Sequence, residues 1–194
     1  PGRTNLVARV EGTDPALGAL LLHGHLDVVP AEADDWSVPP FAAEIRDDPD
    51  SGPVLWGRGA LDMKGTDAVF LSAVRALARS GRRPHRTLVL ALFADEEASG
   101  YRGAKWMAPT HPEAFAGVTD AITEGGGASI RIGAHTAYTR ETAEKWYAGL
   151  RLGVRGGAGR GSLQNRHDAV ILLTRALARV GDHVGPLHLT PTVL

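Results

Sequence analysis

A histidine and several acidic side chains follow short apolar runs at separate points in the chain. His25 and Asp27 come directly after the apolar run 19–23. Residues two apart on an extended chain point to the same side, so both side chains can reach one site. A histidine with a nearby carboxylate suits metal binding, because the second group fixes the orientation and tautomer of the ring. An ordinary polar loop after a strand is the simpler interpretation. These two residues alone do not decide between a metal site and such a loop.

Four further acidic residues, in three segments of the chain, have similar surroundings. Asp62 lies just before a helical pattern, where a capping or first-turn carboxylate is equally expected. Glu96 and Glu97 follow the apolar run 87–93, where a solvated acidic loop is the alternative. Glu124 ends a short apolar run and precedes three glycines, which allow close backbone approach. Adjacent carboxylates at the end of a buried strand repel one another unless a cation compensates them.

The apolar patterns predict an α/β fold with a mostly parallel sheet and helices on both faces. Phe70, Val74 and Leu77 share one face of a helix that Gly81 would end. The expected strands are 5–10, 19–23, 87–93 and 120–123, and the expected helices are 65–80 and 103–107. Residues 47–53 form a turn signal between two short extended pieces. Because the carboxyl ends of parallel strands share one edge, the site candidates would meet there.

That convergence predicts hydrolytic metal chemistry. One imidazole and several carboxylates form a donor set suited to zinc, manganese or cobalt. Two metals bridged by a carboxylate would polarise a carbonyl group and generate hydroxide from water. A glutamate that is not a ligand, beside one that is, could take the proton from that water.

The sequence pattern changes near Trp146, which predicts two domains, 1–145 and 146–194. Residues 146–154 have strand-like stretches, and 156–162 form a glycine-rich turn. An apolar helical stripe then runs from Ala169 to Val180 and ends at Gly181. A strand and one amphipathic helix cannot bury their own apolar faces, so we expect this to be the start of a second domain.

The composition excludes several classes of function. Lys and Arg number 21 against 22 Asp and Glu, which offers no basic footprint for nucleic acid or an anionic membrane. The chain has no cysteine, so thiol nucleophiles and thiolate metal sites are excluded. No glycine-rich dinucleotide fingerprint and no Gly-x-Ser-x-Gly motif occurs. No apolar leader is visible, and we expect a cytoplasmic protein.

Four motifs stand in this order along the chain: Gly24-His25-Leu26-Asp27-Val28-Val29-Pro30, the segment from Trp56 to Gly65, Ala94-Asp95-Glu96-Glu97, and Thr123-Glu124-Gly125-Gly126-Gly127. Together they resemble the M20 family of metallopeptidases and amidohydrolases. The resemblance implies a zinc-exopeptidase-like catalytic domain, followed by an α+β lid or dimerisation domain. It also implies hydrolysis of an amide or peptide bond in N-acyl amino acids or small peptides, and a homodimeric full-length protein.

The resemblance also implies a role for each site residue. Asp27 would orient the ring of His25, and Glu96 would be the general base. Two zinc ions, which cobalt or manganese could replace, would be bound, with one carboxylate bridging them. The implied metal ligands are His25 and Glu124 on the first ion, Glu97 on the second, and Asp62 as the bridge.

Two departures from the family pattern leave an alternative open. Arg160 stands in Gly-Arg-Gly-Ser where the family usually carries Gly-His-Gly-Ser. An arginine can bind a substrate carboxylate or an oxyanion, but it cannot shuttle protons near neutral pH. The family's final histidine ligand is expected after the inserted domain, and no histidine follows His188. The alternative is therefore a truncated or degenerate metal-binding fragment without turnover.

Overall fold

The computed structural model describes residues 2–125, 128–139, 141, 149–157, 159–163, 165 and 167–186. The chain divides into two compact units, Pro1–Gly125 and Gly126–Leu194. The domain boundary expected between residues 145 and 146 lies outside the described residues and stays a prediction. All but one of the site candidates belong to the first unit, and the exception is Arg160.

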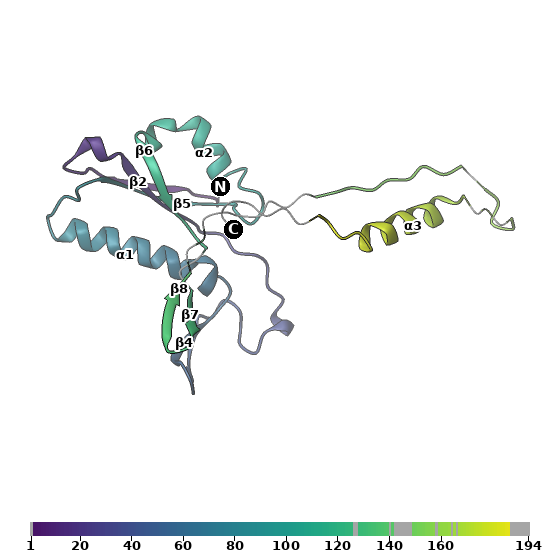
Figure 1. Ribbon diagram of the computed structural model, residues 1–194, viewed down its shortest axis with the longest axis horizontal. Helices are drawn as coiled ribbons and strands as arrows, with labels where there is room; N and C mark the ends of the chain where they lie inside the picture. The colour runs from purple at the N-terminus through teal and green to yellow at the C-terminus, as the bar shows by residue number, and fades with distance from the viewer. Residues whose placement is uncertain are drawn as a thin grey trace. The chain divides into compact units, whose positions relative to one another are not determined.

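A four-stranded sheet forms the centre of the first unit (Figure 1). Its strands are β1 (Leu6–Val10), β5 (Thr87–Phe93), β2 (Ala19–His25) and β6 (Val118–Ile122), in that spatial order. β2 pairs in parallel with both β5 and β6, and β1 pairs antiparallel with β5. The predicted mostly parallel sheet is confirmed, and β5 has the predicted bounds.

Helices cover both faces of this sheet, as predicted. Side chains alternate between the two faces of a strand, so Leu90 and Leu92 of β5 pack under α1 (Gly65–Arg79) with Phe70. Ala91 and Phe93 point to the opposite face, towards α2 (Ala104–Thr110) and the short helix η4 (Pro112–Phe115). This burial on both faces explains why the sequence of β5 is a continuous apolar run.

Shorter elements complete the first unit. The predicted turn joins β3 (Glu44–Asp48) to β4 (Gly52–Trp56) in an antiparallel hairpin. The short helices η1 (Pro15–Leu17) and η2 (Ala33–Asp35) lie in loops. A further short helix, η3 (Ala60–Lys64), leads directly into α1 and carries Asp62. The predicted position of Asp62 just before the long helix is therefore confirmed.

The second unit contains a hairpin that the sequence patterns did not reveal, β7 (Ser129–Ile132) with β8 (His135–Tyr138). The predicted helix is α3 (Ala169–Gly181), and the Asp168 carboxylate caps it by accepting a hydrogen bond from the N–H of Val170. Strand-like stretches were expected at 146–154. Residues 149–154 are not strands, and among the described residues they have no partner strand. Residues 146–148 lie outside the described residues. Among the described residues, no helix is both long and apolar enough to cross a membrane.

Candidate metal centre

His25 is the last residue of β2, and its side chain is only 3% exposed. Its Nδ1 lies 2.9 Å from the backbone oxygen of Asp27, and its Nε2 lies 3.0 Å from Oδ1 of Asp62. A carbonyl oxygen can only accept a hydrogen bond, so Nδ1 carries the proton in the neutral ring. The Nε2 lone pair of that neutral ring then points at carboxylate oxygens. This arrangement is favourable only if Nε2 is protonated or a cation lies between the groups.

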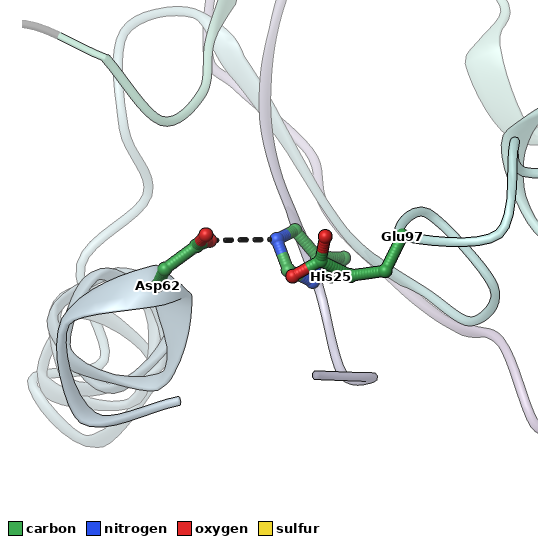
Figure 2. A group of neighbouring side chains, drawn as sticks. All are labelled: His25, Asp62 and Glu97. Atoms are coloured by element: carbon green, nitrogen blue, oxygen red, sulfur yellow. Dashed lines mark hydrogen bonds and ion pairs between the residues drawn. The ribbon is translucent and has the colours of Figure 1, made fainter. Parts of the chain in front are cut away.

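Carboxylates from three other segments surround Nε2 of His25. Asp62 comes from η3, Glu96 and Glu97 follow β5, and Glu124 follows β6. Oε2 of Glu124 lies 3.4 Å from Nε2, and Oε2 of Glu96 lies 4.0 Å away. Figure 2 shows Asp62 and Glu97 approaching the ring from η3 and from the loop after β5. The convergence expected at the carboxyl edge of the sheet is present.

Two groups of possible ligands share His25. One combines it with Asp62 and Glu97, and the other with Glu96 and Glu124. Within each group one donor atom per residue lies within 4.8 Å of the others. These groups mix the residues expected as ligands with Glu96, the expected base. The division of labour between ligands and base therefore stays a prediction.

Asp27 ties two segments of the site together. Its carboxylate accepts hydrogen bonds from the backbone N–H groups of Glu96 and Glu97, at 3.0 and 3.1 Å. The nearer contact of Asp27 with the ring of His25 is made by its backbone oxygen, whereas its Oδ1 lies 3.7 Å from Nδ1. The expected role of the Asp27 carboxylate in orienting the His25 ring stays a prediction, and in the structure this carboxylate holds the loop that carries two of the acidic residues.

The neighbouring backbone is fixed by further contacts. The N–H of Leu26 donates to the oxygen of Phe93, and the Leu26 oxygen accepts from Nζ of Lys64, both at 2.7 Å. The buried carboxylate of Asp95 forms an ion pair with Arg3 and accepts from the backbone N–H of Arg102. The loops after β2 and β5 therefore have anchors outside the acidic cluster.

The electrostatics of the cluster reflect its excess of negative charge. Burial alone would lower the pKa of His25, but the contacts with Asp27 and Asp62 and the nearby glutamates outweigh it, so the pKa is raised. Burial raises the pKa of Glu97, and the carboxylate of Asp62 raises it further. Burial also raises the pKa of Glu124, against the opposing effect of His25. Glu97 and Glu124 are thus less easily ionised than free glutamates, which is the situation a bound cation relieves.

Two features of this region were not found from the sequence. The N–H of His25 donates to Sδ of Met63, at 3.3 Å. Asp67, in the first turn of α1, is 6% exposed, and both its carboxylate oxygens are buried without a hydrogen-bond partner among the described residues. A signal for Asp67 existed, because it occupies the apolar face of Phe70 and Val74 at helical spacing. Arg160 is an exposed residue of the second unit, and its expected role in substrate binding stays a prediction.

Comparison with known proteins gives a consistent family assignment. Residues 21–191 match the family model described as peptidase family M20/M25/M40. Carboxypeptidase S of Saccharomyces cerevisiae is 35% identical over 165 residues, covering 82% of this chain and 28% of that protein. Aminoacylase-1 of Dictyostelium discoideum is 39% identical over 99 residues, covering 51% of this chain and 23% of that protein. The crystal structure of human carnosine dipeptidase 1 matches 61% of this chain and 24% of its own, with a TM-score of 0.50 and 27% identity. The chain thus spans less than a third of the length of each of these relatives.

Proposed function

The chain belongs to peptidase family M20/M25/M40, and from that membership we propose that the acidic cluster around His25 is the metal centre of a hydrolase of amide or peptide bonds. The proposed substrates are N-acyl amino acids or small peptides. The similarity to carboxypeptidase S and aminoacylase-1 supports this substrate class. One observation carries the proposal: Nε2 of a nearly buried histidine lies within 4.0 Å of carboxylate oxygens from Asp62, Glu96 and Glu124.

The donor set fits divalent metal ions. An imidazole nitrogen and carboxylate oxygens suit zinc, and cobalt or manganese accept the same donors. In this proposal zinc would be held by His25, Asp62, Glu97 and Glu124. When bound, zinc polarises a carbonyl group and lowers the pKa of a water molecule.

The other residues of the cluster would position groups and move protons. Glu96 has a side chain that is 53% exposed, so it can meet a substrate at the surface of the cluster. In the proposed reaction its carboxylate takes a proton from the attacking water and gives it to the leaving amine. Asp27 would keep Glu96 in place through the hydrogen bond to its backbone N–H. The expected homodimer and cytoplasmic location stay predictions.

Metal content tests this function most directly. We expect the purified chain to retain about two zinc ions if both proposed sites assemble, and about one if only the His25 side does. Asp62→Ala should lose them, because Oδ1 of Asp62 is the carboxylate atom nearest to Nε2 of His25 in the structure. Asp47→Ala, at an exposed position on β3, is the control for removing one carboxylate and should keep the metal.

Hydrolysis of a panel of N-acyl amino acids and dipeptides then tests the reaction itself. Turnover that depends on zinc and disappears in Asp62→Ala would support the full proposal. Zinc binding without turnover would favour the metal-binding fragment as the alternative. A chain that binds no zinc would contradict the proposal.

A further inference from the structure

Asp67 is a charged side chain in an apolar position. It belongs to the face of α1 that packs on the sheet, together with Phe70 and Val74. Only 6% of the residue is exposed, and among the described residues neither carboxylate oxygen has a hydrogen-bond partner. Burying a carboxylate without partners is strongly unfavourable, whereas an apolar residue would be favourable there. Packing of the core therefore does not explain Asp67.

The carboxylate of Asp67 lies directly behind the strand that carries His25. A side chain on residue 24 would collide with Oδ1 of Asp67 and would come within 2.8 Å of Cε of Met63. Gly24 therefore leaves the space that the carboxylate occupies. The next residue in β2 is His25, whose N–H bonds to Met63. Asp67 is thus placed against the backbone of the site, on the side away from solvent.

The charges that act on Asp67 come from the site. Burial raises the pKa of Asp67, and the positive charges of His25 and Lys64 oppose that rise. Lys64 is exposed and already donates to the oxygen of Leu26. A cation held by the carboxylates around His25 would add to the positive charge that acts on Asp67.

We propose that Asp67 is a buried positioning residue that strengthens cation binding at the His25 cluster without being a ligand. Its negative charge acts through the protein interior, where charges interact more strongly than in water. Its burial also makes the metal-free protein less stable than it would be with a neutral residue at this position. The inference rests on the proposed function, since it requires a cation at the cluster.

Asp67→Asn in the 194-residue chain separates a charge effect from a packing effect, because the two side chains are nearly the same size. Zinc affinity would be measured by competition with a chromophoric chelator. The thermal midpoint of unfolding of the metal-free protein would be measured in the presence of a strong chelator. We expect zinc affinity to fall by about tenfold or more, because charges that interact through the protein interior contribute on that scale. We expect the thermal midpoint of the metal-free variant not to fall. Asp67→Leu, which fills the apolar position, should raise that midpoint and weaken zinc binding as well.

Asp47→Asn, which removes an exposed carboxylate of β3, should change neither quantity and controls for net charge. Unchanged zinc affinity in Asp67→Asn would overturn the inference. A fall of both the zinc affinity and the thermal midpoint of the metal-free variant would also overturn it, because a residue with a purely structural role would give that result. If the unmodified chain binds no zinc, the proposed function fails and the inference fails with it. A different result separates the two proposals. If the chain binds zinc, if Asp62→Ala abolishes that binding, and if Asp67→Asn leaves it unchanged, then the proposed function stands and only the inference about Asp67 fails.

Discussion

The carboxylate of Asp27 accepts a hydrogen bond from the backbone N–H of Glu96, with 3.0 Å between Oδ1 and the nitrogen. Its other oxygen accepts from the N–H of Glu97, and its backbone oxygen lies 2.9 Å from Nδ1 of His25. One residue therefore fixes the ring of the histidine and the loop that carries two glutamates. β2 and β5, which end at these segments, are hydrogen-bonded neighbours, so the site is held across a sheet pairing.

Replacing Asp27 by alanine should damage the site more than the fold. The change leaves two backbone N–H groups without their acceptor, which costs about 1–3 kcal/mol for a buried group and less here, because the Asp27 side chain is 26% exposed. The loop at Glu96 and Glu97 would lose its attachment to β2, so zinc affinity should fall as well. Chemical denaturation and a zinc titration measure the two effects.

A matched control exists at Asp48. Its Oδ1 accepts from the backbone N–H groups of Asp50 and Ser51, at 3.0 and 2.9 Å, in the turn of the β3–β4 hairpin. Asp48→Ala removes the same kind of contact away from the acidic cluster, so it should leave zinc affinity unchanged. Equal losses of zinc affinity in both variants would contradict the role given to Asp27.

The Glu96→Gln substitution should separate proton transfer from metal binding. Glutamine keeps the shape of the side chain and the backbone contact with Asp27, but it cannot accept a proton from water. We expect the zinc content to be unchanged and the hydrolysis of N-acyl amino acids to be lost. Elemental analysis and a turnover assay on the same preparation measure both. A Glu96→Gln protein with normal turnover would show that another group is the base.

Acid should weaken the fold partly through Asp120. Its Oδ2 accepts from Arg86 at 2.6 Å and from Thr119 at 2.9 Å, and these bonds lower the pKa of Asp120 in the folded protein. A group whose pKa is lower in the folded state adds stability above its unfolded pKa of about 4. That contribution disappears as the pH falls through the folded value.

Thermal midpoints followed from about pH 6 to about pH 2 should therefore fall more steeply for the unmodified chain than for Asp120→Asn. The two curves should approach each other at the acidic end, where the carboxyl group of Asp120 is protonated. Parallel curves across this range would mean that the ion pair with Arg86 contributes nothing to folding.

Continuous apolar runs made the central strands predictable. β5 has the predicted bounds because both of its faces are buried. β2 continues two residues further than expected, because Gly24 and His25 pair with Leu92 and Phe93 although neither is a typical strand residue. The hairpin of β7 and β8 was missed because each strand has only four residues, so the polar and apolar alternation of Ser129–Ile132 is too short to stand out.

The meeting of the acidic residues was predictable, whereas the contacts that hold them were not. The common edge of parallel strands was enough to place Glu124 near His25. The acceptor role of Asp27 depends on a loop about 70 positions away, and no local pattern encodes such a pairing. The burial of Asp67, on helix α1, depends in turn on the missing side chain of Gly24 in β2. Such features follow from tertiary packing and need the folded structure.

The close fit between Gly24 and Asp67 leads to a coupled pair of substitutions. Gly24→Ala places a Cβ against Oδ1 of Asp67 and Cε of Met63, so part of the core must shift. Overpacking of this kind costs about 1–3 kcal/mol. Gly57→Ala is the control, because its Cβ would meet its nearest neighbour at an ordinary 3.5 Å.

If the carboxylate of Asp67 is the main obstacle to a side chain at residue 24, adding Asp67→Ala to Gly24→Ala should recover much of the lost stability. The two changes should then be non-additive in a double-mutant cycle measured by denaturation. Additive effects would show that Met63 or the backbone, and not Asp67, limits the space behind His25.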